Sequence, residues 1–242
     1  MTTSRHRIEV HGIPVEVVRK DIKNLYLAVY PPDGRVRVSV PLRINDEEVR
    51  LAVTSRLGWI SKRQKVFAQQ ERQSKREMIT GESHYYQGRR YRLDVIEHDA
   101  VPTVSLVNKT TIEVRVRPDA SADKREAVLY QWYRQQLQMQ VPALIARWEP
   151  EIGVTVAEWR IKKMKTRWGT CNIEARRIWL NLELAKKTVS CLEYIVVHEM
   201  VHFLERLHNH RFRELMDRFM PQWRMHGDEL NQFALAQSDR CR

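Results

Sequence analysis

The segment at residues 192–207 constrains this chain most, because it contains the pattern H-E-x-x-H at residues 198–202. Positions i and i+4 of an α-helix lie on one face, so the imidazoles of His198 and His202 can reach one metal ion. Glu199 stands beside the first imidazole, where a carboxylate can take a proton from a water molecule. The pattern therefore predicts a helix that holds a catalytic metal.

Helical periodicity across the same segment supports this interpretation. At about 100° per residue, the apolar side chains fill one broad arc, and the ionisable side chains fill the other, with only Ile195 out of place. We therefore expect a helix that packs into a core on one side and carries its ionisable stripe on the other. The alternative interpretation is a solvated polar face that carries two histidines by chance.

Two histidines do not complete a catalytic zinc site, because zinc usually takes three protein ligands and a water. In a straight helix, His208 would lie about 9 Å beyond His202 along the axis, whereas Zn–N bonds are only about 2.0–2.1 Å. The chain must therefore turn, and Asn209 tolerates the left-handed conformation that ends helices. His208 and His210 are both candidates for the third ligand. Glu205 is a candidate for a partner that orients a ligand, or for a competing ligand.

Length and composition are those of a soluble globular protein, with 242 residues, 43% hydrophobic and 30% charged. No apolar run approaches the roughly 20 residues that a membrane helix needs, and the start of the chain has no apolar signal region. The three cysteines, Cys171, Cys191 and Cys241, have no framework spacing. We therefore expect free thiols, a cytoplasmic location and no membrane partner.

The net charge of +12 is unevenly distributed. Residues 56–92 hold ten Lys or Arg against three Asp or Glu, and residues 159–177 hold seven against one. Such patches can attract phosphate backbones or acidic proteins. A solvated surface is the alternative interpretation, since no recognisable nucleic-acid module accompanies the charge. Nucleic acid is thus a candidate partner.

The first part of the chain, residues 1–118, is expected to be β-rich. Its predicted strands form pairs around turn signals, one of them Pro31-Pro32-Asp33-Gly34, and cover residues 7–11 and 14–19, 25–30 and 35–40, 83–87 and 90–97, and 103–107 and 111–117. Helices interrupt this region at about residues 45–79. A capping box at Asn45 and Glu48 starts a helix to about Leu57.

Gly58 is expected to separate that helix from a second, polar one that runs from about Ile60 to Met78. Apolar residues are sparse after Phe67, so the second helix is expected to expose a basic face. This face is either a docking arm for an anionic partner or a solvated connector.

The second part, residues 119–242, is expected to be the metal module. Ser121 caps a long helix whose apolar residues recur at helical spacing. Pro142 kinks or divides this helix, and Pro150 and Gly153 end it.

Strands are then expected over residues 154–164 and 177–184, separated by a loop. The second strand directly precedes the metal helix. It is either a rail on which an extended peptide pairs by backbone hydrogen bonds, or an ordinary sheet strand. After His208, apolar residues at helical spacing predict another amphipathic helix that ends before Pro221.

Four motifs of this second part resemble those of a known family. They are M-K-T-R-W-G-T-C at residues 164–171, I-W-L-N-L at 178–182, Y-I-V-V-H-E-M-V-H at 194–202, and His208 followed by Phe212. Together they resemble the YgjP-like metallopeptidases, which are related to the SprT-like and other minimal zinc proteases. The resemblance is specific over about residues 160–223 and looser over the β-rich front. Thr170 stands where the family usually has Ser, and residues 205–207 differ from the commoner loop.

Matched residue by residue, the resemblance implies that His198, His202 and His208 hold Zn²⁺ and that Glu199 is the catalytic residue. It implies an α+β fold, in which a β-rich N-terminal part precedes a minimal zincin-like module with an H-E-x-x-H active-site helix. The implied activity is hydrolysis of peptide bonds in a protein or peptide substrate.

A peptidase also needs a donor that stabilises the oxyanion. Tyr194, Arg167 and His210 are candidates for this role or for contacts with the substrate. Tyr194 lies one helical turn before His198, where a packing role is the alternative.

Three other functions compete with this prediction. In a peptide-deformylase-like site, Cys171 would join the two helix histidines. In a nucleic-acid-associated protein, the basic patches would bring the peptidase to DNA-bound proteins, or the peptidase fold would be a vestigial scaffold. In a structural zinc domain, Cys171 or His210 would close the site as a fourth ligand.

Overall fold

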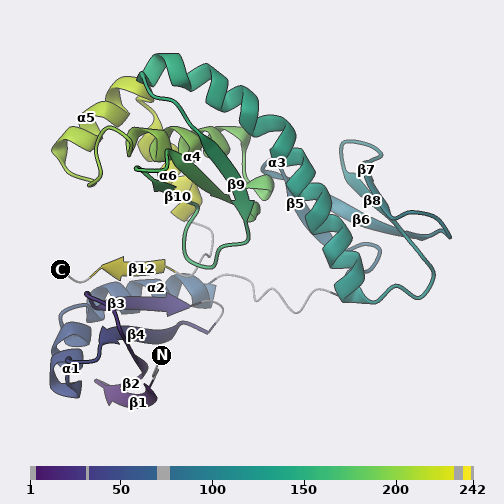
Figure 1. The fold of residues 1–242 in the computed structure, drawn as a ribbon. Helices are drawn as coiled ribbons and strands as arrows, with labels where there is room; N and C mark the ends of the chain where they lie inside the picture. Colours follow the sequence, from purple (N-terminus) through teal and green to yellow (C-terminus); the bar gives the residue numbers. More distant parts are fainter. Residues whose placement is uncertain (1–3, 31–32, 70–76, 232–236, 241–242) are drawn as a thin grey trace. The chain divides into compact units, whose positions relative to one another are not determined.

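The computed structural model describes residues 4–30, 33–69, 77–231 and 237–240. The chain forms two compact units, one drawn from residues 1–74, 165–167 and 232–242, and the other from residues 75–164 and 168–231. The fold is mixed α+β with a β-rich N-terminal part, as predicted (Figure 1). The domain boundary expected after residue 118 falls inside the second unit. None of the described helices is long and apolar enough to span a membrane.

The first unit is built on a five-stranded sheet. Its strands, in the order β1-β2-β4-β3-β12, are β1 (Ser4–Val10), β2 (Ile13–Lys20), β4 (Arg35–Pro41), β3 (Tyr26–Tyr30) and β12 (Gln237–Arg240). The expected hairpin at the start is confirmed, since β1 and β2 pair antiparallel and His11 and Gly12 between them have positive φ values of 49° and 75°. Strands β3 and β4 also pair antiparallel, as expected. Pro31 and Pro32 of their predicted turn lie outside the described residues.

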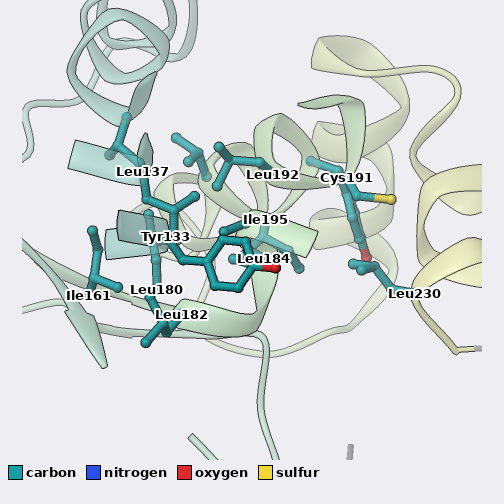
Figure 2. Packing of buried hydrophobic residues seen from close by; sticks show 14 of the residues in the cluster. Tyr133, Leu137, Ile161, Leu180, Leu182, Leu184, Cys191, Leu192, Ile195 and Leu230 are labelled. Carbon is teal, nitrogen blue, oxygen red and sulfur yellow. The ribbon is translucent and has the colours of Figure 1, made fainter. Parts of the chain in front are cut away.

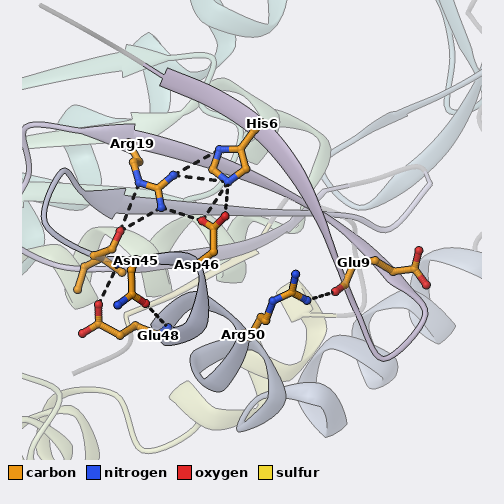
Figure 3. A network of polar contacts seen from close by, with 8 residues as sticks. His6, Glu9, Arg19, Asn45, Asp46, Glu48 and Arg50 are labelled. Atoms are coloured by element: carbon orange, nitrogen blue, oxygen red, sulfur yellow. Dashed lines mark hydrogen bonds and ion pairs between the residues drawn. The ribbon is translucent and has the colours of Figure 1, made fainter.

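Two helices pack against this sheet. Helix α1 (Asp46–Thr54) begins with the predicted capping box, in which the Asn45 side chain accepts from the Glu48 N–H and the Glu48 carboxylate accepts from the Asn45 N–H, both at 2.9 Å. Figure 3 shows how Asp46, at the start of α1, also accepts from Arg19 of β2 at 2.7 Å. These polar contacts fix the start of α1 against the sheet.

Helix α2 (Leu57–Gln69) differs from the prediction at its start. Gly58 lies within α2 instead of separating the two helices, and α1 ends at Thr54, before the expected Leu57. A Cβ at Gly58 would meet nothing within 4 Å, so no packing requirement is attached to this glycine. Met78, the expected end of α2, is not helical and has a φ of 56°. Residues 70–76 of the predicted helix lie outside the described residues.

The second unit begins with a four-stranded sheet that packs on a long helix. The strands, in the order β5-β6-β8-β7, are β5 (Ser83–Tyr86), β6 (Arg89–Glu97), β8 (Thr111–Val116) and β7 (Thr103–Leu106), and they confirm the four predicted ranges. The hydroxyl of Tyr133 on the helix donates to the Tyr85 carbonyl at 2.8 Å, and the ring of Trp132 lies 4.7 Å from that of Tyr86. These contacts explain why the four-stranded sheet and the following helix form part of the same compact unit.

That helix, α3 (Ala122–Ile152), is one continuous element (Figure 1). Ser121 caps it as predicted, accepting from the Lys124 N–H at 3.4 Å. Pro142 and Pro150 both lie inside it, so the expectation that Pro150 ends the helix was wrong. Buried side chains along one face hold the helix across both prolines. It ends at Gly153, whose φ of 76° is a left-handed conformation that suits glycine.

A second sheet leads to the metal motif. Its strands, in the order β10-β11-β9, are β10 (Gly169–Asn172), β11 (Arg177–Asn181) and β9 (Glu158–Lys162). Strand β10 lies within the expected loop. Strand β11 pairs with β10 on one side and β9 on the other, so its backbone groups are already used. The interpretation of β11 as a strand on which an extended peptide pairs was therefore wrong. Strand β10, and not β11, forms the edge of the sheet on that side.

After the 3₁₀-helix η1 (Leu182–Lys186), three helices complete the unit, namely α4 (Val189–Val201), α5 (His210–Phe219) and α6 (Trp223–Asn231). Helix α5 confirms the predicted amphipathic helix before Pro221. Helix α4 ends at Val201, six residues earlier than the segment that its periodicity suggested. Figure 2 shows Leu192 and Ile195 of α4 packed among Tyr133 and Leu137 of α3 and Leu180 of β11.

Helix α4 is buried more completely than its periodicity predicted. Ile195 and Glu199, which lie toward the expected polar stripe, are only 6% and 5% exposed. Strand β10 accounts for this, because a Cβ at Gly169 would lie 2.8 Å from Ile195 Cγ2 and 2.5 Å from Glu199 Oε1. The ionisable stripe is thus enclosed by the protein instead of facing solvent along its whole length.

Asn181 fixes the end of β11 just before η1. Its side chain is fully buried, accepts from the N–H groups of Met164 and Glu183 at 3.3 and 3.2 Å, and donates to the Met164 carbonyl at 2.9 Å. Three backbone groups would lose this partner if the amide were removed. Asn181 therefore ties the end of β9 to the turn that leads into α4.

We predict that Asn181→Ala lowers the free energy of unfolding by about 2–3 kcal/mol, because buried backbone groups are left unsatisfied. Asn172→Ala is the control, since Asn172 is exposed and its side chain accepts from the exposed Ala175 N–H, so its loss should cost less than about 1 kcal/mol. Urea unfolding followed by tryptophan fluorescence reports mainly on the second unit, which holds all tryptophans except Trp59. Equal losses in the two variants would contradict the role assigned to Asn181.

Candidate metal centre

Three imidazoles converge where α4 ends. The Nε2 atom of His208 lies 3.0 Å from Nε2 of His198 and 3.1 Å from Nε2 of His202. Two ring nitrogens at such distances repel each other unless a shared proton or a cation lies between them. Ligands on a tetrahedral zinc, with Zn–N bonds of about 2.0–2.1 Å, lie about 3.3 Å apart. The three nitrogens are therefore spaced closely enough to bind one ion together.

The chain brings His208 back by ending α4 early. The backbone tightens after Val201, where the Leu204 and Glu205 N–H groups both donate to the Val201 carbonyl, at 2.9 and 3.0 Å. Helix α5 then begins at His210, and the side chain of its N-cap residue, Asn209, accepts from the Phe212 N–H at 3.0 Å. The predicted turn is present, but Asn209 is an extended N-cap with φ −82°, instead of the left-handed residue that we expected.

Glu205 orients one of the imidazoles through its backbone. The Glu205 carbonyl lies 3.0 Å from Nδ1 of His202. A carbonyl can only accept, so Nδ1 carries the proton and Nε2 presents its lone pair to the other two rings. The Glu205 side chain accepts from the Leu207 N–H at 3.1 Å. It therefore closes the turn, and of the two roles considered for Glu205 the orienting one fits this geometry.

Phe212 forms an aromatic support under the three imidazoles. Its ring is stacked on His202 at 4.6 Å and lies 5.0 Å from His198 and 4.8 Å from His208. Phe212 is 1% exposed, so it is fixed in the core of the unit. The sequence places Phe212 in a family motif and among the apolar residues of the helix expected after His208, but it predicts no role for Phe212 at the metal centre. Its spacing of four residues after His208 was the available signal.

The surroundings keep these imidazoles neutral. Burial lowers the pKa of His202 from 6.5 to about 4 and lowers the pKa of His198 well below its ordinary value, with further contributions from the neighbouring rings. Burial also lowers the pKa of His208. Nδ1 of His198 is buried without a hydrogen-bond partner among the described residues. Neutral imidazole is the form that binds metals, so the donor set fits Zn²⁺.

Glu199 lies beside this trio under β10. It is 5% exposed, and the backbone of Gly169 passes so close that any Cβ there would overlap the carboxylate. Cys171, also on β10, forms a side-chain hydrogen bond with Glu199. Burial, followed by the charge of Glu199, raises the pKa of the Cys171 thiol to about 12. Among the described residues, Cys171 is not grouped with the histidines, so the peptide-deformylase-like arrangement is not formed.

The remaining predicted site residues have other surroundings. The ring of Tyr194 meets His198 edge-on at 5.7 Å, but its hydroxyl lies against Gly227 of α6, which favours a packing role. His210 is largely exposed and lies 3.4 Å from Glu214, away from the trio. Arg167 is exposed and belongs to the segment that clusters with the first unit. Within the described chain, no fourth His, Cys, Asp or Glu joins the three histidines, so the closed site of a structural zinc domain is not formed.

Part of the basic stretch at residues 159–177 is engaged by neighbouring side chains. Arg160 and Arg177 both pair with Glu158, and the Lys162 ammonium lies 3.1 Å from the centroid of the Trp179 ring. These contacts lie between neighbouring side chains of β9 and β11 and stabilise the surface of that sheet. A nucleic-acid partner stays a prediction.

Comparison with known proteins gives a family for the chain. The family model described as YgjP-like, metallopeptidase domain, matches residues 23–233, which confirms the resemblance found in the motifs. A search of curated proteins finds no match. Among solved structures, the metallopeptidase zymogen of Pyrococcus abyssi abylysin is 18% identical, with 37% of this chain and 90% of that chain covered and a TM-score of 0.35. A likeness at this TM-score does not bear on the fold of the chain.

We predict that the metal-free protein loses stability as the pH falls from about 6.5 to about 4. Unfolded His202 takes up a proton near its ordinary pKa of 6.5, whereas folded His202 does so only near pH 4. The unfolded state therefore binds more protons across this window, and His202 alone contributes up to about 3 kcal/mol to the change. His202→Asn should flatten the slope of unfolding free energy against pH, measured in chelator-treated protein. Parallel slopes for the two proteins would show that His202 is not held neutral by burial.

Proposed function

Because the chain belongs to the YgjP-like metallopeptidase family, we propose that it hydrolyses peptide bonds with one zinc ion held by His198, His202 and His208. The observation that supports this most directly is the position of His208 Nε2, which lies 3.0 Å from Nε2 of His198 and 3.1 Å from Nε2 of His202, with the buried carboxylate of Glu199 on the residue after His198. Three ligands leave a coordination position for solvent or substrate, as catalytic zinc sites require.

We assign the proton transfers to Glu199. Zinc, when bound, lowers the pKa of water toward about 7 and polarises the scissile carbonyl. The Glu199 carboxylate accepts the proton of the attacking water and then passes it to the leaving amine. Strand β10 holds this carboxylate on one side, through Gly169 and Cys171, which limits the positions it can take. General acid–base catalysis requires a carboxylate that is held in a defined position, here beside the three histidines.

The outer edge of β10 is our candidate for pairing with the peptide. Among the described strands, β10 lies at the end of its sheet, with only β11 as a neighbour. An extended peptide can add to such an edge through backbone hydrogen bonds. Gly169, at the start of this strand, lies directly over Glu199. A peptide on this edge would therefore pass close to the proposed base.

We predict that Glu199→Gln keeps its zinc but lowers the rate of peptide cleavage at least 100-fold, because the amide cannot accept the proton. His208→Ala should lose both zinc and cleavage. Zinc content is measured by mass spectrometry of metals, and cleavage by peptide mapping of a synthetic peptide library. Chelation should abolish cleavage by the unmodified protein, and added Zn²⁺ should restore it.

The proposal fails if the zinc-loaded protein cleaves no member of the library. It also fails if highly purified Glu199→Gln retains the rate of the unmodified protein. Retention of zinc by His208→Ala with full activity would remove His208 from the ligand set while leaving Glu199 as the base.

We predict that Gly169→Ala lowers the cleavage rate by about 100-fold or more while zinc content is retained. The added methyl group would lie 2.5 Å from Glu199 Oε1, so the carboxylate must move, and small displacements of a catalytic group are costly. Gly58→Ala is the matched control, because a Cβ there meets nothing within 4 Å. The ratio kcat/KM of the two variants on one cleaved library peptide is compared. Equal values for Gly169→Ala and Gly58→Ala would show that β10 does not position Glu199.

A further inference from the structure

A second group of side chains of the types that bind metals lies on α4 and α6, outside the histidine trio. Cys191, His226 and Glu229 each offer one ligand atom, and these atoms all lie within 4.8 Å of one another. His226 and Glu229 are three residues apart on α6, a spacing that places two side chains on one face of a helix. Cys191 comes from the first turn of α4, so the group connects two helices.

Contacts with neighbouring groups hold Cys191 and Glu229 in place. Cys191 is fully buried, and its sulfur lies 3.8 Å from the His226 carbonyl. Figure 2 shows this sulfur turned away from Leu192 and Ile195. The Glu229 carboxylate accepts from the Thr188 hydroxyl at 3.2 Å, and Thr188 is also the N-cap of α4. The contacts at the start of α4 therefore fix the positions of the Cys191 sulfur and the Glu229 carboxylate.

His226 provides the independent sign of a ligand. Its side chain is 9% exposed, and Nδ1 is buried without a hydrogen-bond partner in the described part of the chain. A buried polar atom without a partner is costly and calls for an explanation, such as a bound ion or a bound water. The nearby thiol and carboxylate are the donors that an ion would add to this ring.

We propose that Cys191, His226 and Glu229 bind a second divalent ion of the zinc class, separate from the catalytic trio. Thiolate, imidazole and carboxylate together suit Zn²⁺ better than hard ions such as Mg²⁺ or Ca²⁺. On binding, the Cys191 thiol releases its proton to solvent and the sulfur becomes a ligand. This inference goes beyond the proposed hydrolysis and does not depend on it.

The second ion would tie α6 to α4 behind the active site. Cys191 precedes His198 by seven residues, so the two lie on the same face of α4, about 10 Å apart along the axis. Tyr194 lies between them, with its ring 5.7 Å from that of His198 and 6.4 Å from that of His226. An ion at Cys191 would thus fix α6 against the aromatic residue that supports the first ligand.

The other cation available to this group is Lys187, whose charge acts on both Cys191 and Glu229. If Lys187 alone compensates their charge, no metal is needed. The two explanations differ in one measurable respect, because only a metal bonded to sulfur produces a thiolate-to-metal charge-transfer band.

The test is a titration of metal-free full-length protein with Co²⁺, followed by near-ultraviolet absorption. We expect a thiolate-to-cobalt band in the unmodified protein and in His198→Ala/His202→Ala, which lacks the first site. The band should be lost in Cys191→Ser and retained in Cys171→Ser, the matched control. Glu229→Gln, at a partly exposed position that need not disturb folding, should weaken Co²⁺ binding at this site at least tenfold.

Absence of a thiolate band in the unmodified protein would overturn the second site and leave Lys187 as the compensating charge. So would a band that disappears in Cys171→Ser but not in Cys191→Ser. An unchanged affinity in Glu229→Gln would also contradict the proposed ligand set. None of these outcomes bears on Glu199 or on the three histidines, so failure of the second site is distinguishable from failure of the proposed peptidase activity.

Discussion

The hydrogen bond between Nδ1 of His202 and the Glu205 carbonyl is the contact on which the metal centre depends. It forms only because α4 ends at Val201 and the backbone tightens into a turn. The same turn fixes the protonation of the His202 ring and returns the chain so that His208 faces the helix. If α4 continued for one more turn, Glu205 would extend the helix and the three Nε2 atoms would not meet.

The metal centre is also built into the core of its unit. Glu199 and His202 are 5% and 8% exposed, and Phe212 beneath the imidazoles is 1% exposed. Burial keeps the rings neutral and restricts their orientation, which suits them for a metal ion. It also places the functional residues under the same packing constraints as the apolar residues around them. Strand β10 is one such constraint, since its backbone at Gly169 closes over Glu199 with no room for a side chain.

Local signals predicted much of this fold. The capping box at Asn45, the hairpin at Gly12 and the strand pairs of the second unit follow from contacts between residues near each other in the chain. The sequence does not predict strand β10, because its residues G-T-C-N show no alternation of apolar side chains. This segment forms a strand only because it pairs with β11. The sequence predicts that Pro150 ends α3, but the tertiary packing of this helix overrides that local signal.

In the metal centre, the H-E-x-x-H pattern predicted His198 and His202, and the family resemblance selected His208 over His210, whereas the orientation of the rings came from the backbone. The Glu205 carbonyl has no sequence signature, and the group of Cys191, His226 and Glu229 joins residues more than thirty positions apart.

Anomalous diffraction at the zinc absorption edge from crystals of the zinc-loaded protein tests the central claim most directly. The account predicts a peak about 2.0–2.1 Å from Nε2 of His198, His202 and His208, with the Glu199 carboxylate beside it and not bonded to it. A peak bonded to Cys171 in place of His208, or no peak at the trio, would contradict the account.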